Sequence, residues 1–146
     1  MQPDRQLLGG RYRLASIIAT GGMGQVWEAR DTVLGRDVAV KVLRSEYTGD
    51  PTFLARFRAE AQHSAGLVHP NVATLFDHGE DPFDENAAYL VLELVDGPSL
   101  SEVLRREGRL PAGRVLELLR DAAAGLSAAH RAGVCLLYTS PSPRDS

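Results

Sequence analysis

The sequence is poor in the residues that make covalent cross-links and in the long apolar runs that enter membranes. Its single cysteine, Cys135, can form no internal disulfide and is too few for a cysteine-based metal site. No apolar run approaches the roughly 20 residues needed to cross a bilayer, and residues 1–10 lack the apolar core of a signal peptide. These absences predict a soluble chain in the cytoplasm.

An excess of charge of one sign is also missing. The chain has 16 basic and 19 acidic residues, for a formal net charge of −3, which gives no reason to expect a nucleic-acid or membrane partner. Hydrophobic residues make up 44% and charged residues 24%, as in an ordinary globular protein, and 146 residues suffice for about one domain.

Several stretches are rich in β-forming residues. The sequence predicts strands over residues 12–19, 25–30 and 36–43, and the short turns between them indicate an antiparallel meander. Two further short strands are predicted over residues 74–77 and 88–95. An acidic loop over residues 80–86 is expected to separate these two strands.

Helix signals appear where the strand pattern stops. Asp50 followed by Pro51 predicts a helix start, and Gly66 predicts its end. A capping-box pattern at residues 99–102 predicts a short second helix, and Pro111 opens a longer third helix. The predicted order of elements is therefore β-β-β-α-β-β-α-α.

A glycine-rich turn and a strand lysine are the first chemical signals. Gly21, Gly22 and Gly24 would let backbone N–H groups approach phosphate oxygens closely, although a plain hairpin turn explains them equally well. Lys41 is a charged residue in an apolar strand, which is costly unless the charge is paired. Its ammonium could bind phosphate, or it could extend to solvent.

The third signal is an acidic residue at the border of the apolar stripe on the first predicted helix. Glu60 could reach Lys41 and hold its ammonium in place, or it could pair with Arg56 one helical turn earlier. Each residue alone is ambiguous, but the order of the three signals along the chain indicates a phosphate site.

This order resembles the eukaryotic-like protein kinases, in their bacterial Ser/Thr branch, over residues 7–134. The resemblance implies an α+β fold in which a kinase-like N-lobe, a five-stranded antiparallel sheet plus one helix, precedes the first helices of an incomplete C-lobe. The segments that carry it are Gly-Gly-Met-Gly-Gln-Val-Trp-Glu-Ala-Arg-Asp (21–31), Val-Ala-Val-Lys-Val-Leu (38–43), Arg-Phe-Arg-Ala-Glu-Ala (56–61), His-Pro-Asn (69–71) and Leu-Val-Leu-Glu-Leu-Val-Asp-Gly (90–97).

The resemblance also implies an ATP site. The loop 19–24 would cover the phosphates, and Lys41 would contact the α- and β-phosphates with Glu60 as its ion-pair partner. Adenine would lie among apolar side chains, beside a gatekeeper and against the backbone carbonyl and N–H of the hinge. The implied binding residues are Ile18, Ala19, Thr20, Gly21, Gly22, Met23, Gly24, Val26, Ala39, Lys41, Leu92 as gatekeeper, Glu93 through its carbonyl and Val95 through its N–H.

One position departs from the family pattern. Ala19 stands where the family has the first glycine of the loop, and its methyl group restricts the backbone. We expect a stiffer loop and weaker nucleotide binding, without loss of binding.

The resemblance divides the chain into an N-terminal extension (1–10), an N-lobe with hinge (11–97), the start of a C-lobe (98–134) and a segment that does not match (135–146). Reverse translation of Cys135 to Asp145 gives, in frame, a sequence that resembles a transposase-type adapter for sequencing libraries. We therefore interpret residues 135–146 as non-native, and sequencing the gene across codon 134 tests this.

The resemblance implies a protein Ser/Thr kinase that uses ATP and Mg²⁺, with protein substrates and a homodimer of the complete protein as partners. The family's catalytic Asp, metal-binding Asn and Asp-Phe-Gly segment do not occur in this chain. We therefore expect no metal site and no phosphoryl transfer in these 146 residues, and a single-pass membrane anchor elsewhere in a longer protein remains open.

Two alternatives stay open. The first is a pseudokinase or nucleotide-binding interaction module, for which Ala19 is the only support. The second is a structural domain without a ligand.

Overall fold

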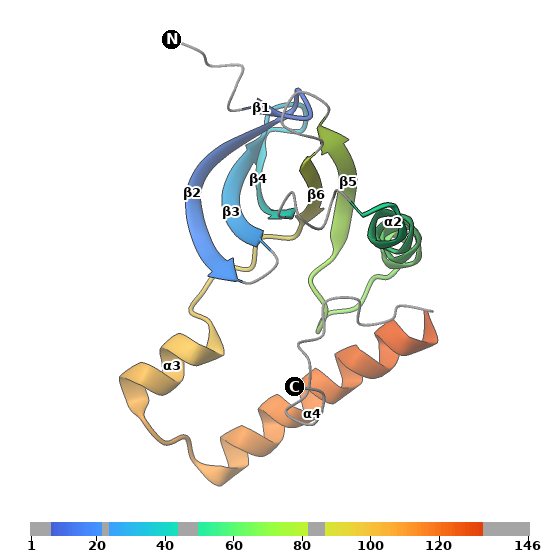
Figure 1. Cartoon of the computed structure of the whole chain (residues 1–146). Helices are drawn as coiled ribbons and strands as arrows, with labels where there is room; N and C mark the ends of the chain where they lie inside the picture. Colours follow the sequence, from blue (N-terminus) through green and yellow to red (C-terminus); the bar gives the residue numbers. More distant parts are fainter. Residues whose placement is uncertain (1–6, 22–23, 44–49, 82–86, 133–146) are drawn as a thin grey trace.

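The computed structural model describes residues 7–21, 24–43, 50–81 and 87–132. A curled antiparallel sheet forms one end of the molecule, with its strands in the order β1-β2-β3-β4-β6-β5 (Figure 1). The five predicted strands are confirmed, and a two-residue strand, β1, adds a sixth at one edge. The strands are β1 (Leu7–Leu8), β2 (Tyr12–Gly21), β3 (Gly24–Asp31), β4 (Arg36–Leu43), β5 (Leu75–Asp81) and β6 (Ala87–Leu92).

The predicted ends of β5 and β6 need correction. β5 continues to Asp81, although the acidic composition after residue 79 suggested a loop, and β6 ends at Leu92 rather than at residue 95. The extension of β5 depends on a close approach that Gly79 permits. A Cβ atom at Gly79 would lie 2.6 Å from the hydroxyl oxygen of Tyr89 on β6. The pairing of β5 with β6 therefore outweighs the weak local strand propensity.

The three helices follow the predicted caps. α2 (Pro51–Ala65) begins after Asp50, whose carboxylate accepts the N–H of Thr52 at 2.9 Å. α3 (Leu100–Glu107) begins after Ser99, whose hydroxyl accepts the N–H of Glu102 at 3.2 Å. α4 (Ala112–Arg131) is the longest helix of the described chain. None of these helices is long and apolar enough to cross a membrane.

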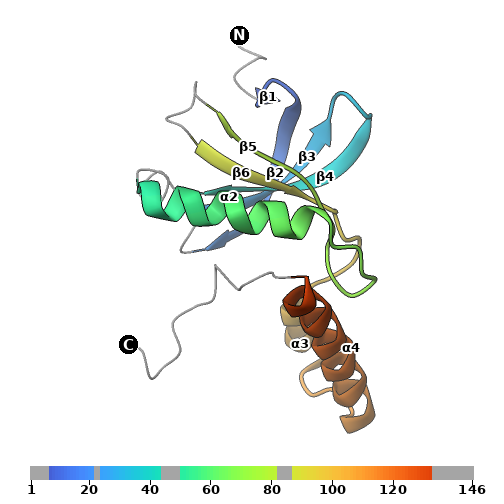
Figure 2. The ribbon, with the colours of Figure 1, turned by 90° about the vertical axis from the view of Figure 1, so that its right-hand side faces the viewer.

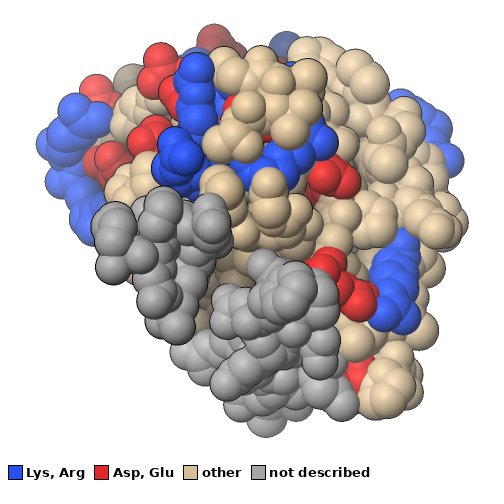
Figure 3. Space-filling model, turned by 90° about the horizontal axis from the view of Figure 1, so that it is seen from above, with Lys and Arg blue, Asp and Glu red and all other residues tan. Residues whose placement is uncertain are grey.

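The elements form two groups. α2 lies across one face of the sheet, whereas α3 and α4 lie together beyond the end of the sheet at which β2 turns into β3 (Figures 1 and 2). Viewed from the opposite end of the sheet, basic and acidic side chains are interspersed over the surface (Figure 3). Residues 135–146, which we interpret as non-native, lie outside the described part of the chain.

The sheet has a core on each face. The larger core lies on the concave side and contains the buried residues Leu8, Tyr12, Ala29, Val38, Val40, Tyr89 and Val91. The smaller core lies under α2 and contains Leu43, Phe57 and Ala88. Neighbouring residues of β4 point to opposite faces, so the alternation of strand side chains assigns Val38 and Val40 to the first core and Leu43 to the second.

The loop after α2 makes close contact with α4. The side-chain amide of Asn71 donates to the carbonyl of Asp121 at 3.0 Å. Gly125, one turn later on α4, lies so close that an added Cβ would be 2.7 Å from the carbonyl oxygen of Asn71. Glycine inside a helix normally costs stability, and this approach explains its presence.

Candidate functional site

The register of the sheet brings the predicted adenine and phosphate residues to one face. Val26 lies opposite Lys41, and Ala39 lies opposite Leu92. Residues directly opposite in antiparallel strands share a face, and so do alternate residues of one strand. All four therefore face the side that carries Leu43 and α2.

The glycine-rich turn joins the ends of β2 and β3. Gly21 pairs with Gly24, and Thr20 pairs with Gln25 just before them. Gly24 has a φ of 157°, and an added Cβ would overlap the carbonyl oxygen of Val42 and lie 3.0 Å from Cα of Leu43. Gly24 is therefore required by the close backbone of β4, a reason that the sequence did not indicate. Gly22 and Met23 lie outside the described residues.

The unusual alanine of this turn lies inside a strand. Ala19 belongs to β2 and pairs with Val26, next to an irregularity in the register at Ile17. Such paired, extended backbone suits any L-amino acid. Ala19 and its neighbour Ile18, which is 52% exposed, border the same turn. The expected stiffening of the loop by Ala19 stays a prediction.

Lys41 occupies the middle of the site face. Its neighbours across the sheet are Val26 on β3 and Leu90 on β6, so its stem lies between apolar side chains. The side chain is half-buried, and desolvation by this burial lowers the pKa of Lys41 below its ordinary value. A phosphate group placed against the ammonium would compensate the desolvation.

The helix that carries Glu60 packs against the same face. Phe57 and Ala61 of α2 are buried, and Phe57 packs with Leu43 and Ala88 of the sheet. Glu60 lies between these two buried positions in the helix, but its side chain is outside the described part of the structure. The ion pair between Lys41 and Glu60 therefore stays a prediction.

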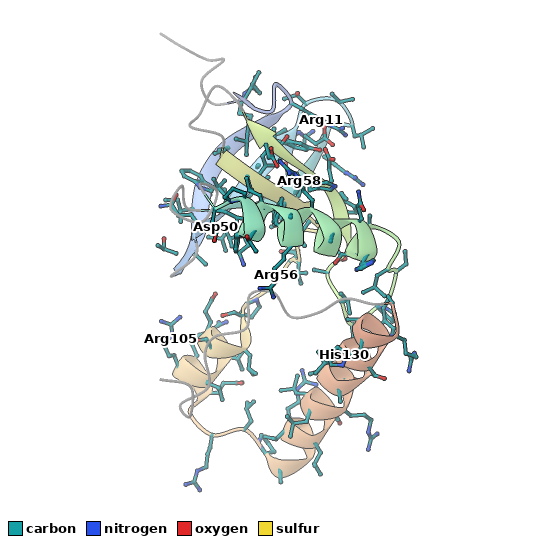
Figure 4. All side chains as sticks on the ribbon, turned by 45° about the vertical axis from the view of Figure 1, so that its right-hand side comes forward. Arg11, Asp50, Arg56, Arg58, Arg105 and His130 are labelled. Carbon is teal, nitrogen blue, oxygen red and sulfur yellow. The ribbon has the colours of Figure 1, made fainter. Side chains whose placement is uncertain are left out.

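Two contacts that the sequence did not indicate fix α2 against β5. The guanidinium of Arg58 contacts the Glu80 carboxylate, with Nη2 at 2.6 Å and Nε at 2.8 Å from Oε1. The ring of Phe57 meets the ring of His78 edge-on, with centroids 6.3 Å apart. Figure 4 shows Arg58 on the sheet side of α2 and Arg56 on the side toward α3 and α4. No local pattern could have predicted pairs about 20 residues apart.

The hinge begins where β6 ends. The N–H of Glu93 donates to the carbonyl of Thr74 at 2.8 Å, and the N–H of Thr74 donates to Oε1 of Glu93 at 3.2 Å. Val95 is 66% exposed. Within the described residues, the Glu93 carbonyl and the Val95 N–H form no hydrogen bond with protein. The hinge thus retains one backbone acceptor and one backbone donor for a ligand.

A second polar cluster lies far from this site, at the opposite end of the sheet (Figure 4). Arg11 contacts both oxygens of the buried Asp31 carboxylate, at 2.9 and 2.8 Å, and this pairing holds the pKa of Asp31 well below its usual range. One Asp31 oxygen also accepts the N–H groups of Val33 and Leu34, which closes the turn from β3 to β4.

The same end of the sheet contains a buried tyrosine. The Tyr12 hydroxyl donates to Asp77 of β5 at 2.7 Å, and its ring meets that of Tyr89 edge-on. Burial, together with the hydrogen bond to Asp77, raises the pKa of Tyr12. These contacts hold strands β2, β5 and β6 together.

The described residues contain no group of three or more His, Cys, Asp or Glu side chains arranged to hold a metal ion.

The family model for the protein kinase domain matches residues 12–137. The chain belongs to the protein kinase family. The kinase-like lobe and first C-lobe helices expected from the sequence are therefore confirmed, and the loop, Lys41 and hinge lie within the matched range.

Relatives identify the branch. The chain is 54% identical over 129 residues to serine/threonine-protein kinase PknA of Mycobacterium tuberculosis, covering 87% of this chain and 30% of that protein. It is 46% identical over 135 residues to a probable serine/threonine-protein kinase of Streptomyces coelicolor, covering 92% and 20%. The chain is thus similar to bacterial serine/threonine-protein kinases and spans less than a third of the length of these relatives.

Solved kinase structures have the same fold. The crystal structure of the PknI kinase domain from Mycobacterium tuberculosis superposes with a TM-score of 0.72 at 27% identity. The match covers 84% of this chain and 49% of the PknI chain.

Proposed function

We propose that the complete protein transfers the γ-phosphoryl group of ATP to Ser or Thr hydroxyls of proteins, and that this chain supplies the nucleotide-binding part. The observation that carries the proposal is the single sheet face shared by Val26, Ala39, Lys41 and Leu92. That face combines an apolar surface for a flat base with a cation for phosphates, and it continues into a hinge with a free acceptor and donor.

Each group has a defined task in this proposal. The Lys41 ammonium binds the α- and β-phosphates and is held by Glu60, while the backbone of the loop 19–24 covers them. Ile18, Val26 and Ala39 enclose the base, and Leu92 limits the depth of the pocket.

The hinge reads the edge of the base. The carbonyl of Glu93 accepts from the 6-amino group of adenine, and the Val95 N–H donates to the ring. Mg²⁺, when bound to the nucleotide, neutralises charge on the phosphates.

The proposal assigns nucleotide binding to residues 11–97 and gives residues 98–134 the role of a C-lobe start. Proton acceptance from the substrate hydroxyl is assigned to the family's catalytic loop, so these 146 residues alone would transfer no phosphate. Protein substrates and a homodimer of the complete protein are the proposed partners.

Equilibrium binding and activity test this proposal separately. The product of the uninterrupted gene should bind ADP and ATP and should phosphorylate a protein substrate with Mg²⁺. A product that binds neither nucleotide would refute the nucleotide site. Binding without phosphorylation would favour the pseudokinase alternative.

A further inference from the structure

The hydrogen bonds where β5 and β6 end are unusual. Leu75 and Leu92 are the last paired residues, and the next bond runs from the Glu93 N–H to the Thr74 carbonyl at 2.8 Å. Opposite residues in an antiparallel ladder that share one such bond normally exchange the reciprocal bond as well. The Thr74 N–H would then donate to the main-chain carbonyl of Glu93. In this structure it donates to the side-chain oxygen Oε1 of Glu93 at 3.2 Å.

We propose that the Glu93 carboxylate replaces that residue's own carbonyl as the acceptor for the Thr74 N–H. This exchange of acceptors ends the hydrogen-bond ladder between β5 and β6 one pair early. It leaves the main-chain carbonyl of Glu93 available to the amino group of the base. Glu93 is thus a positioning residue through its side chain, in addition to the contact that its backbone makes. This inference rests on the proposed nucleotide site.

The use of the Glu93 carboxylate as acceptor, in place of the main-chain carbonyl, is chemically favourable. A backbone N–H rarely stays without an acceptor, so Thr74 must find a partner at the hinge. An ionised carboxylate is a stronger acceptor than an amide carbonyl, and it wins this competition. The hinge carbonyl is then ready before the ligand arrives, which removes an ordering cost from binding.

Removal of the carboxylate should restore the ordinary ladder. In Glu93→Ala the main-chain carbonyl of residue 93, which lies opposite Thr74 in the register, is the acceptor that completes the ladder. The ladder would gain one pair, and the carbonyl would turn toward β5. A ligand that donates from its amino group would then have to break that bond.

The experiment compares two nucleotides on the complete gene product. One is ADP, and the other is purine riboside 5′-diphosphate, which has hydrogen in place of the 6-amino group. Dissociation constants are measured by calorimetry for wild type, Glu93→Ala and Glu93→Gln. Glu117→Ala is the matched control, because Glu117 is an exposed glutamate on α4 in an i,i+3 pair with Arg114.

Glu93→Ala should raise the Kd for ADP about 5- to 10-fold, as expected for one hydrogen bond, and the Kd for the analogue less than about 2-fold. Glu93→Gln keeps an amide oxygen as acceptor, so its ADP affinity should stay within about 2-fold of wild type. Glu117→Ala should bind both nucleotides as wild type does.

Two results would overturn the inference. Equal weakening of both nucleotides in Glu93→Ala, with a lower Tm, would show that the carboxylate only stabilises the fold. Unaltered preference for ADP in Glu93→Ala would show that the carbonyl does not depend on the carboxylate. Wild-type protein that binds neither nucleotide would instead refute the proposed nucleotide site, and the inference would fall with it.

Discussion

The two faces of the sheet contrast sharply. The concave face is closed: its apolar residues are buried, and at its end Asp31 is paired with Arg11 while Tyr12 is paired with Asp77. The site face is half open, since Val26, Lys41 and Leu92 are only half-buried. One sheet thus combines a surface whose polar groups are paired with one another and a surface that is partly open to solvent.

The largest expected effect is the loss of Lys41 from the site face. Lys41→Met in the complete protein should lower kcat/KM for ATP about 1,000-fold, because a preorganised phosphate contact is removed. The Tm should stay close to that of wild type. Steady-state kinetics and thermal unfolding measure the two quantities.

Arg30→Met is the control for that substitution. Arg30 is a basic residue of the same sheet, exposed and paired with Asp37 at 3.0 Å. Its loss should leave the kinetics unchanged. If both variants lowered kcat/KM equally, the site face would have no special role for Lys41.

Substitution of a buried residue should lower stability on either face, but it should weaken ADP binding only on the site face. Phe57→Ala removes the main contact of α2 and should lower the free energy of unfolding by about 3 kcal/mol, with weaker ADP binding. Val40→Ala on the concave face should cost about 2 kcal/mol and leave ADP affinity unchanged. Denaturant titrations and calorimetry measure both. Weaker ADP binding by Val40→Ala would remove the distinction between the faces.

Acid should reduce stability mainly through the end of the sheet at which Asp31 pairs with Arg11. The pKa of Asp31 is depressed in the folded protein, so its pairing stabilises the fold above the unfolded-state pKa of about 4, and this stability is lost as the pH falls toward the folded value. Asp31→Asn should reduce the number of protons that the protein takes up on unfolding between pH 5 and 2.5 by up to about one. Unfolding curves at several pH values measure this.

Asp37→Asn is the comparison for the acid experiment, since Asp37 pairs with Arg30 in an exposed position. Its substitution should change the free energy of unfolding at neutral pH by less than about 1 kcal/mol. Identical slopes for Asp31→Asn and wild type would mean that the Arg11 pair adds no pH-dependent stability.

The smallest effect concerns the turn of the site face. Ala19→Gly should tighten ADP binding by less than about 3-fold, because the loop becomes less restricted. Ala15→Gly in the same strand loses the same methyl group away from the turn and should not change the affinity. Equal ADP affinity for Ala19→Gly and wild type would disprove the stiffening.

Local signals predicted much of this molecule. The strand around Lys41 has the predicted bounds, 36–43, because its β-branched residues favour a strand and the turn before it marks where the strand begins. The caps at Asp50 and Ser99 also function as expected, since a cap depends on only a few neighbouring residues.

The sequence did not reveal the contacts between segments that are distant along the chain. The pairs Arg11–Asp31, Arg58–Glu80 and Thr74–Glu93 each join residues about 20 positions apart, and no periodicity marks them. The strand β1 was missed because two residues are too few for a pattern. In the candidate site, the residue types were predictable, whereas the carboxylate that accepts the Thr74 N–H became visible only when the strands were placed in register.

The approach of Asn71 to Gly125 has a consequence for how this chain can vary over time. A side chain at position 125 would collide with the backbone of the loop, so an alanine there requires position 71 to move away and to give up its bond to Asp121. Because the nearest atom belongs to the main chain, a different side chain at position 71 would not relieve the collision. Related chains that keep this path of the loop should therefore keep glycine at position 125.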